Sequence, residues 1–319
     1  MYFHWRKRAF ILALAIVTLL AVNGCGFRTS HPVKMRTSTA VLKEATLEQL
    51  VETINANAAR IKSLKANPVD IDSSVVELKK DRVKDNPQVS GWVLLRKPEM
   101  LRMRVLVPVV RTVMIDMVSD GKKFELSIPP KNKFIVGSNR EPAKPSAQPL
   151  YNIRPQHIFD ALLLKAVDPA DGEIAVLENS TEIVKDPKSH KDVEQANYAV
   201  LVIRKDEAGY YLSRKIFFSR TDLLAHEQYI YNRQGQLATY AHYENFSDYS
   251  GIMFPGIVSI QRPVEGYGIT LSIVKMDVNV PLTDEQFVLT QPPGSQLINV
   301  DTQAAAAITD EEHKKPPQR

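Results

Sequence analysis

The fold is decided by residues 89–107, which read VSGWVLLRKPEMLRMRVLV. An apolar run, Trp92-Val-Leu-Leu95, precedes a short break at Lys97-Pro98-Glu99, and apolar and polar residues alternate after it. Alternation with a period of two is typical of half-buried strands, and proline is favoured in tight turns. The stretch therefore predicts two antiparallel strands, Val89–Arg96 and Met100–Val107, joined by a turn.

The second of these strands sorts its side chains by chemistry. Successive residues of a strand point to opposite faces, so Arg102 and Arg104 share one face. The other face carries Leu101, Met103 and Val105, which we expect to point toward a core or a cavity.

Further runs with a period of two follow along the chain. Two of the breaks carry hairpin signals, at Asp120-Gly121 and at Asn232-Arg-Gln-Gly235. Short connections of this kind predict an antiparallel meander rather than parallel βαβ units. The other predicted strands are residues 69–75, Arg111–Ser119, Lys122–Ile128, Lys133–Val136, Ile174–Leu177, Tyr198–Arg204, Gly209–Phe218, Ala225–Tyr231, Leu237–Phe246, Ile257–Arg262 and Tyr267–Val274.

Two segments have helical spacing instead. Thr46-Leu-Glu-Gln49 matches a capping box and opens an amphipathic helix predicted over Thr46–Ala66, before Pro68. Pro155–Val167 is predicted to form a second helix. Many strands with few helices indicate a mainly β, α+β fold. We expect an incomplete antiparallel β-barrel with helices packed in or over its concave face, which leaves an apolar interior.

The N-terminus carries an export signal. Arg6, Lys7 and Arg8 precede an apolar run from Ala9 to Val22, and Cys25, the single cysteine, follows. The run is about 14 residues long, shorter than the roughly 20 that a membrane-spanning helix needs. Cys25 placed there resembles the lipobox of bacterial lipoproteins, in which the thiol is acylated, although Asn23 departs from the usual small residue. The alternative is an uncleaved anchor helix with an unrelated cysteine.

The pattern divides the chain into four parts. Residues 1–24 are the predicted signal peptide, 25–45 a flexible tether, 46–300 the folded domain and 301–319 a disordered tail. Loss of the signal lowers the net charge from +5 to +2, because it removes three basic residues and no acidic ones. The remaining basic residues are spread out, which argues against a nucleic-acid partner.

Several motifs occur in a particular order. Ile61-Lys-Ser-Leu64 precedes a strand, turn and strand at Gly91-Trp-Val-Leu-Leu-Arg-Lys-Pro98 and Leu101-Arg-Met-Arg104. Ser119-Asp-Gly121 follows, and Val280-Pro-Leu-Thr-Asp-Glu-Gln-Phe287 with Pro292-Pro-Gly294 ends the domain. In this order the motifs resemble the LolA/LolB-like superfamily. The proline-rich insert at 138–150 and the charged tail are departures from its pattern.

The resemblance implies a half-barrel whose cavity holds acyl chains. Superfamily members carry lipoproteins across the periplasm or, as lipoproteins themselves, receive that cargo at the outer membrane. The lipobox is similar to that of the anchored receptors, and Gly26, where Asp would favour inner-membrane retention, indicates the outer membrane. The expected partners are membrane lipid through acylated Cys25, the acyl chains of lipoproteins or other lipids, and a periplasmic carrier protein.

Residues Leu106-Val107-Pro108-Val109-Val110 are apolar at a predicted strand junction. Turns are usually polar, and an apolar loop at a comparable place helps anchored receptors to deliver cargo, so we expect a membrane or cargo loop here. The alternative is that these residues belong to the core of a bulged strand. A second apolar set, Phe254-Pro-Gly256-Ile257 near Tyr249 and Met253, fits a cavity rim or an ordinary loop.

Several apolar side chains are candidates for the lining of a cavity. An acyl-chain site and a dry core use the same residue types, so both interpretations stay open. The candidates are Trp92, Leu94, Leu101, Met103, Val105, Met114, Phe124, Phe134 and Phe217.

Motifs for catalysis, metal binding and cofactor binding are missing from the sequence. The seven histidines contain no i,i+4 pair, and neither GxSxG nor GxGxxG occurs. We therefore expect a non-enzymatic protein without a metal or cofactor. The alternatives to a lipid or lipoprotein carrier-receptor are an envelope sensor and a structural or assembly lipoprotein on the same fold.

Overall fold

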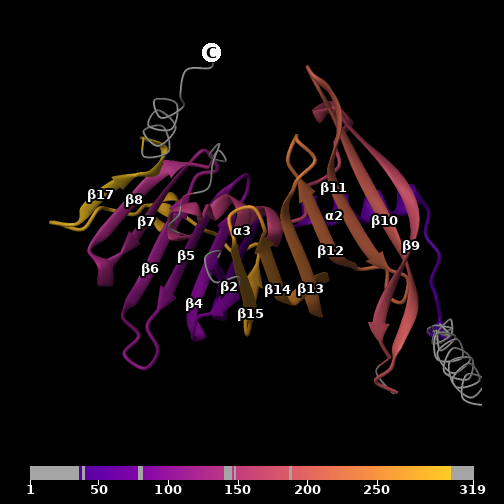
Figure 1. Ribbon diagram of the computed structural model, residues 1–319, viewed down its shortest axis with the longest axis horizontal. Coiled ribbons are helices and arrows are strands. Elements are labelled where there is room, and N and C mark those ends of the chain that lie inside the picture. Colours follow the sequence, from indigo (N-terminus) through magenta and orange to yellow (C-terminus); the bar gives the residue numbers. More distant parts are fainter. Residues whose placement is uncertain are drawn as a thin grey trace, which may run out of the picture.

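The computed structural model describes residues 36–37, 40–77, 82–139, 146, 149–186 and 189–302. Seventeen strands of these residues form one sheet, which curves around two α-helices (Figure 1). The predicted mainly β fold, an incompletely closed antiparallel barrel with helices against its concave face, is confirmed. The predicted signal peptide, Cys25 and the tail from residue 303 lie outside the described residues.

The registers join the strands in a continuous order. From one side of the sheet to the other it is β9–β10–β11–β12–β13–β14–β15–β2–β4–β5–β6–β7–β8–β17, antiparallel except for the last pair. Short strands β1, β3 and β16 pair beside β10 and β2. The bounds are β1 Arg36–Thr37, β2 Ser63–Glu77, β3 Arg82–Asp85, β4 Val89–Arg96, β5 Met100–Leu106, β6 Val113–Ser119, β7 Lys123–Ile128, β8 Lys133–Ser138, β9 Glu173–Lys185, β10 Asp192–Asp206, β11 Gly209–Ser219, β12 Ala225–Tyr231, β13 Leu237–Tyr249, β14 Ile252–Arg262, β15 Tyr267–Ile273, β16 Met276–Val278 and β17 Gln296–Asn299.

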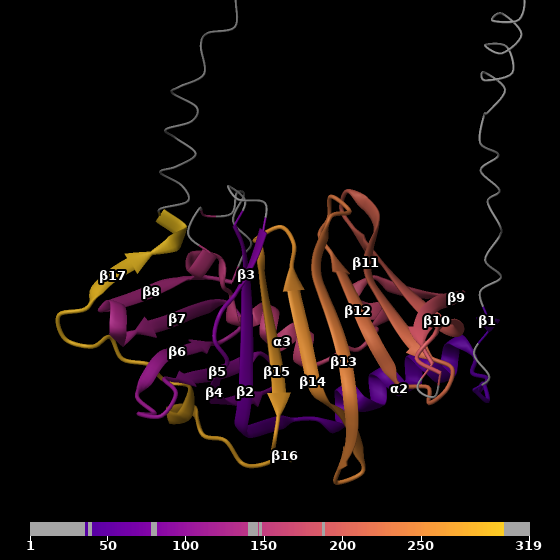
Figure 2. The same cartoon turned by 60° about the horizontal axis from the view of Figure 1, so that its bottom comes forward.

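Strand β2 connects the two halves of the sheet. Its residues pair with β4 on one side and with β15 and β16 on the other. The register with β4 shifts between Ala66 and Val69, around Pro68, which has no N–H to donate. Strands β4–β8 and β9–β15 run in clearly different directions in Figure 2, as expected of a strongly twisted sheet.

The helices are shorter than the sequence predicted. Helix α2 spans Leu47–Arg60, and its capping box at Thr46 and Gln49 is confirmed. The chain turns extended at Ile61 and enters β2 at Ser63, so the helix predicted to Ala66 is wrong from Ile61 onward. Leu64 and Ala66 instead pair with β4, because pairing in the sheet buries them completely. Helix α3 spans Pro155–Leu162, not Pro155–Val167.

Within the described part of the chain, four 3-10 helices lie in the connections. They are η2 Pro129–Lys131, η3 Pro149–Asn152, η4 Pro169–Asp171 and η5 Asp284–Phe287. Helix η5 begins with a second capping box, in which Thr283 and Gln286 bond each other's backbone. It lies in the C-terminal segment between β16 and β17.

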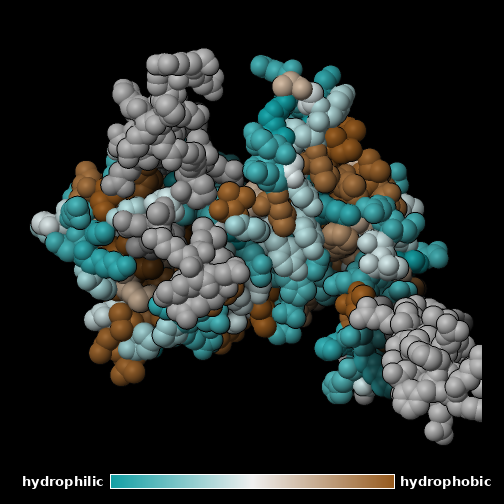
Figure 3. Space-filling model, in the orientation of Figure 1, coloured by the Kyte–Doolittle hydropathy of each residue, from teal (hydrophilic) through white to brown (hydrophobic). Residues whose placement is uncertain are grey.

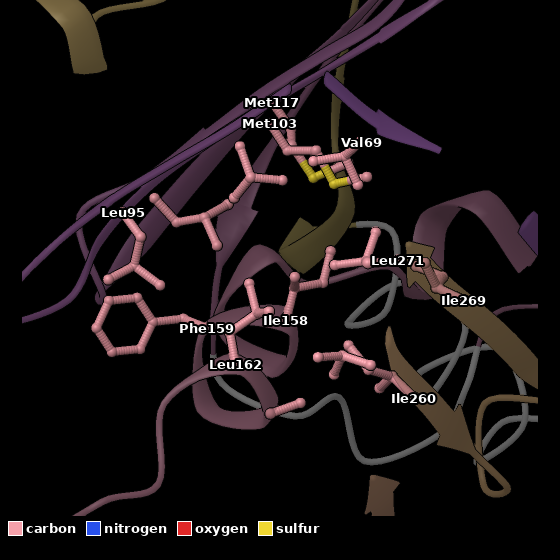
Figure 4. Close-up of a cluster of buried hydrophobic side chains, with 14 of the residues drawn as sticks. Val69, Leu95, Met103, Met117, Ile158, Phe159, Leu162, Ile260, Ile269 and Leu271 are labelled. Carbon is pink, nitrogen blue, oxygen red and sulfur yellow. The ribbon is translucent and has the colours of Figure 1, made fainter. Parts of the chain in front are cut away.

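The concave face of the sheet holds the main core. Side chains of α3 point toward both halves of the sheet, as Figure 4 shows for Ile158, Phe159 and Leu162. They meet Leu95, Met103 and Met117 from one half, and Ile260, Ile269 and Leu271 from the other. Helix α2 covers a second cluster over β10 and β11, with Leu50 and Ile54 against Val200 and Phe218. The sheet is therefore held in its curve by apolar burial under two helices.

Three further segments differ from their predicted form. β9 continues to Lys185 and β14 already begins at Ile252, so Phe254-Pro-Gly256-Ile257 lies in a strand. Both extensions pair with a neighbouring strand, which overrides weak local preference. The predicted tether also lies partly on the sheet, since Arg36–Thr37 pair with β10 and the Lys43 amide donates to Arg220 O at 2.7 Å.

Candidate functional site

An apolar cleft lies between α2, the end of α3 and the strands β11–β14. Apolar atoms dominate the lining because α2 turns the apolar side of its amphipathic helix toward the sheet. Three leucines add to it, Leu162 at the end of α3 and Leu163 and Leu164 directly after it. The lining residues are Thr53, Ile54, Asn57, Ala58, Ile61, Leu162, Leu163, Leu164, Phe218, Leu224, Ala225, Tyr243, Phe246, Met253, Phe254 and Pro255.

Helix α2 is attached to the body of the protein by polar contacts that are part-buried or exposed. Asn55 exchanges two hydrogen bonds with the backbone of Val167, of 3.1 and 2.8 Å. The Arg60 guanidinium donates to Gly251 O at 2.6 Å, and the Lys97 ammonium donates to Ala58 O. Burial lowers the pKa of Lys97.

Helix α3 is attached by buried polar groups instead. The Arg214 guanidinium donates to Lys165 O at 2.6 Å, just after the helix, and lies 2.9 Å from the buried Glu173 carboxylate. His157 Nδ1 lies 3.2 Å from Tyr267 Oη in the interior. Burial holds the pKa of His157 well below its ordinary value, and the neighbouring guanidiniums Arg262 and Arg154 lower it further.

The cleft is small. Its cavity volume of about 60 Å³ is room for a few water molecules, not for an acyl chain. The concave interior beside it is filled, since Ile158, Ala161 and Leu101 are almost completely buried. A long apolar ligand would need one wall of the cleft to move outward.

Four of the nine predicted lining residues lie together on the concave side. Leu101, Met103, Val105 and Phe124 are buried in the core around α3, and half-buried Met114 packs against its margin. There they serve as core, so the sequence could not distinguish them from a lining.

The other four predicted lining residues lie on the convex face. The register places Trp92 opposite Arg104 and Leu94 opposite Arg102, so both share the face of the arginines. Phe134 pairs with Ser127, which in turn pairs with Asp116 on that face. Phe217 contacts Tyr229 there, with 5.5 Å between ring centroids. The signal that could have found this is the turn at Lys97-Pro98-Glu99. A pairing of Arg96 with Met100 across it places Leu94 opposite Arg102 and Trp92 opposite Arg104, on the face of the arginines.

The predicted membrane or cargo loop projects into solvent. Val109 is 97% exposed and Val110 66%, so the alternative of core residues in a bulged strand is wrong for these two. Figure 3 shows apolar atoms at the lower left, where the β5–β6 connection projects in Figure 1. Val109 has φ of 69°, an unfavourable conformation for a β-branched residue. The Arg111 amide closes the loop on Val107 O at 2.9 Å.

The sequence pattern does not indicate most of the cleft. Ile54, Ala58 and Phe246 were assigned to helix or strand faces without a role, although Phe254 and Met253 were named as a rim. Met253 is exposed at the mouth of the cleft, whereas Phe254 is buried. The missing signal was the position of α2 over the sheet, which depends on contacts distant in sequence.

No protein-family model matches the chain, and no curated protein matches it. Among solved structures, a LolA superfamily protein from Nitrosomonas europaea is similar at 14% identity and a TM-score of 0.46, over 77% of this chain and 99% of that one. A DUF1329 family protein from Desulfovibrio piger is similar at 12% identity and a TM-score of 0.47, over 77% of this chain and 98% of that one. A putative outer membrane lipoprotein-sorting protein domain from Vibrio parahaemolyticus is similar at 12% identity and a TM-score of 0.44. The likeness covers 76% of this chain and 97% of that one.

At such identities the likeness concerns the fold alone. The chain itself has the open antiparallel sheet with helices on the concave side that its sequence predicted. Among the described residues, no helix is both long and apolar enough to cross a membrane.

Proposed function

We propose that this protein is a non-enzymatic, lipid-anchored envelope protein that binds acyl chains of lipids or lipoproteins in the cleft beneath α2. The acylated Cys25 would hold it at the outer membrane, with the domain facing the periplasm. Its cargo would come from the membrane or from a periplasmic carrier protein.

The observation that carries this proposal is the apolar cleft that α2 covers from one side. Leucine, phenylalanine and methionine side chains line it without a charged residue, which suits a hydrocarbon chain. The Arg60 hydrogen bond is exposed and those of Asn55 are part-buried. Leu50 and Ile54 hold α2 in the second core cluster, so opening has to break apolar contacts as well. Outward movement of α2 would enlarge the cleft while α3 stays in place.

The β5–β6 loop supplies a contact with the bilayer under this proposal. Val109 and Val110 expose apolar surface at the tip, beside Arg111, whose charge suits an anionic membrane surface. The loop holds them outward through the strained backbone at Val109. Strain retained in a loop without a core role is consistent with a functional contact.

Native mass spectrometry of the full chain extracted from membranes tests the cleft. Ala58→Phe fills it from α2, and Ala59→Phe adds the same side chain on the exposed neighbouring position outside the cleft. We expect bound acyl species on the wild type and on Ala59→Phe, and a loss of about tenfold or more on Ala58→Phe. Equal acyl occupancy in both variants, or none in the wild type, would contradict binding in this cleft.

The loop is tested by transfer of acylated cargo from the full chain to liposomes. Val109→Glu with Val110→Glu places two charges at the tip without touching the core, so folding should be retained. We expect slower transfer and unchanged acyl occupancy. Unchanged transfer by a folded variant would remove the loop from the proposal.

A structural or assembly lipoprotein is the second candidate. The filled interior and the small cleft favour it, because neither requires a ligand. A wild-type chain without bound lipid in the same mass spectra would support this candidate instead.

A further inference from the structure

The convex face of the sheet carries a second pocket, on the opposite side from the cleft. It lies over β4 and β5, where the C-terminal segment with η5 passes across them (Figure 2). Its volume is about 260 Å³, and it is lined by Lys65, Asn67, Trp92, Leu94, Arg102, Arg104 and Gln286. No acidic residue is among them.

Trp92 forms the apolar centre of this pocket. Strand pairing places it directly opposite Arg104 and diagonal to Arg102. The two guanidinium carbons lie 5.1 and 5.7 Å from the centre of its ring. Both distances fall within the range of cation–π contacts.

One carboxylate serves both arginines. Arg102 donates to the two oxygens of Asp116 at 3.0 and 2.9 Å, and Arg104 Nε donates to Asp116 Oδ2 at 2.9 Å. The side chain of Asp116 is 6% exposed, so the single negative charge is buried beneath two positive ones. Together with Lys65, the pocket holds a net positive charge.

Several donors of the pocket have no acceptor among the described residues. Arg102 is occupied, since its Nη1 also donates to Gln286 O at 3.0 Å and Val288 O at 3.2 Å. Arg104 Nη1, the Lys65 ammonium and the side-chain amide of Asn67 are not hydrogen-bonded by the part of the chain that the structure describes, whereas the Asn67 backbone N–H donates to Lys275 O at 2.9 Å. These three groups come from two adjoining regions of the sheet and line one pocket.

We propose that this pocket binds a phosphate ester, with the phosphoryl oxygens on Arg104, Lys65 and Asn67 and the attached group against Trp92 and Leu94. Guanidinium groups match phosphate geometry, and Asp116 pre-orders them by holding Arg102 and Arg104 in place. The phosphate ester could be a phospholipid headgroup or a small soluble molecule. This site is independent of acyl binding in the cleft, because it lies on the other face of the sheet.

A network that serves stability alone would look different. Pairing one buried aspartate with one arginine would satisfy the charge, yet here a second arginine shares Asp116. Lys65 lies opposite the exposed Asp277 in the register of β2 with β16, so three cations face two carboxylates. Arg104 is 31% exposed, which leaves its guanidinium accessible to an anion from the solvent.

The full chain carrying Trp5→Phe retains Trp92 as its single tryptophan, so fluorescence reports on this pocket alone. Phenyl phosphate is the soluble probe, and benzoate at equal concentration tests whether any aromatic anion suffices. Vesicles of phosphatidylglycerol, compared with vesicles of phosphatidylcholine, test the headgroup as the source. Added salt should weaken binding in each arm.

We expect phenyl phosphate to alter Trp92 fluorescence in a saturable manner, with benzoate weaker. Arg104→Gln should lower the affinity about tenfold, and Lys65→Gln about threefold. Lys123→Gln, an exposed lysine on β7 outside the pocket, should have no effect. If phosphatidylglycerol vesicles show the same dependence on both residues, the source is a lipid headgroup.

The proposal is overturned if neither probe changes Trp92 fluorescence, or if Lys65→Gln and Lys123→Gln behave alike. Benzoate binding as tightly as phenyl phosphate would also overturn it. Lys65 has no partner that its loss would leave buried, so a folding defect cannot mask the result. Failure here leaves the acyl-binding test unaffected, since that test uses mass spectra of the cleft.

Discussion

The two faces of one sheet differ in how they treat charge. On the concave face, one ion pair is fully buried: Arg262 and Glu265 are 2% and 4% exposed, and Arg262 Nε donates to Glu265 Oε2 at 3.0 Å. On the convex face, Arg104 is 31% exposed beside Trp92 and shares its carboxylate with Arg102. The same strands thus carry a closed interior on one side and an open, positively charged pocket on the other.

This difference shows where function can reside in the fold. Buried pairs and dense packing hold the curve of the sheet, so the concave interior between α3 and the strands has little freedom to accept a ligand. The α2 cleft and the Trp92 pocket lie beside that interior. Both would bind through groups that the core does not need.

The largest expected effect comes from breaking the sealed charge pair. Glu265→Ala should leave the Arg262 guanidinium buried with Thr239 as a remaining partner and lower the free energy of unfolding by about 3–5 kcal/mol. Denaturant unfolding measures it. Asp192→Ala is the control, since its contact with Lys185 is largely exposed and should contribute under about 1 kcal/mol. Equal losses would mean that burial does not distinguish the two pairs.

Packing on the concave face gives the next effect. Met103→Ala should remove about 2–5 kcal/mol, because Met103 is 2% exposed between α3 and β6 and its truncation leaves a cavity. Gln261→Ala, on the convex face of β14, should change stability by less than about 0.5 kcal/mol. Thermal or denaturant unfolding of both variants compares the faces directly. A small loss for Met103→Ala would indicate that the interior is loose enough to accept a ligand.

The smallest effects concern two histidines on opposite faces. The pKa of His157, on the concave side, is lowered chiefly by burial. As the pH falls, the unfolded chain therefore binds a proton at this imidazole before the folded chain does. Its folded state therefore loses stability as the pH falls below about 6.5. Convex His242 has a raised pKa, mainly through Glu227, whose Oε1 lies 3.5 Å from Nδ1. Its contribution is present below about pH 6.5 and is lost as the pH rises through the folded pKa.

The free energy of unfolding, measured at about pH 5 and about pH 8, distinguishes the opposite pH dependences of the two histidines. The loss of unfolding free energy that His157→Gln causes relative to the wild type should be smaller at the lower pH. The loss that His242→Gln causes should be larger at the lower pH. The comparison between pH values removes the constant cost of the lost contact with Tyr267 in His157→Gln. Shifts of the same sign in both variants would contradict the assignment of opposite environments.

Much of the fold could be predicted from local patterns. The strand patterns between turn signals predicted the bounds of β4 and β12 to the residue, and the capping box predicted the start of α2. Helix ends and strand extensions could not be predicted, since Leu64 follows a helical pattern but is buried by pairing with β4. Strand β9 continues through polar residues because β10 offers it a partner.

For the candidate sites too, local pattern could be read from the sequence, whereas pairing between strands could not. Alternation alone separated Met103 from Arg104, because successive strand residues face opposite sides whatever the rest of the chain does. Trp92 was assigned to the wrong face, because its side follows from the register with β5, which forms between strands.

The sequence by itself determined most of the long strands, the start of the amphipathic helix after Thr46 and the apolar stretch at Val107–Val110, since each is a property of neighbouring residues. It did not predict the short strands β1, β3, β16 and β17. Tertiary structure alone decided that α2 and the leucines after α3 enclose a cleft, and that Trp92, Lys65 and Arg104 share a pocket. The physical reason is that these groups meet through sheet register and helix packing, which join residues far apart in the chain.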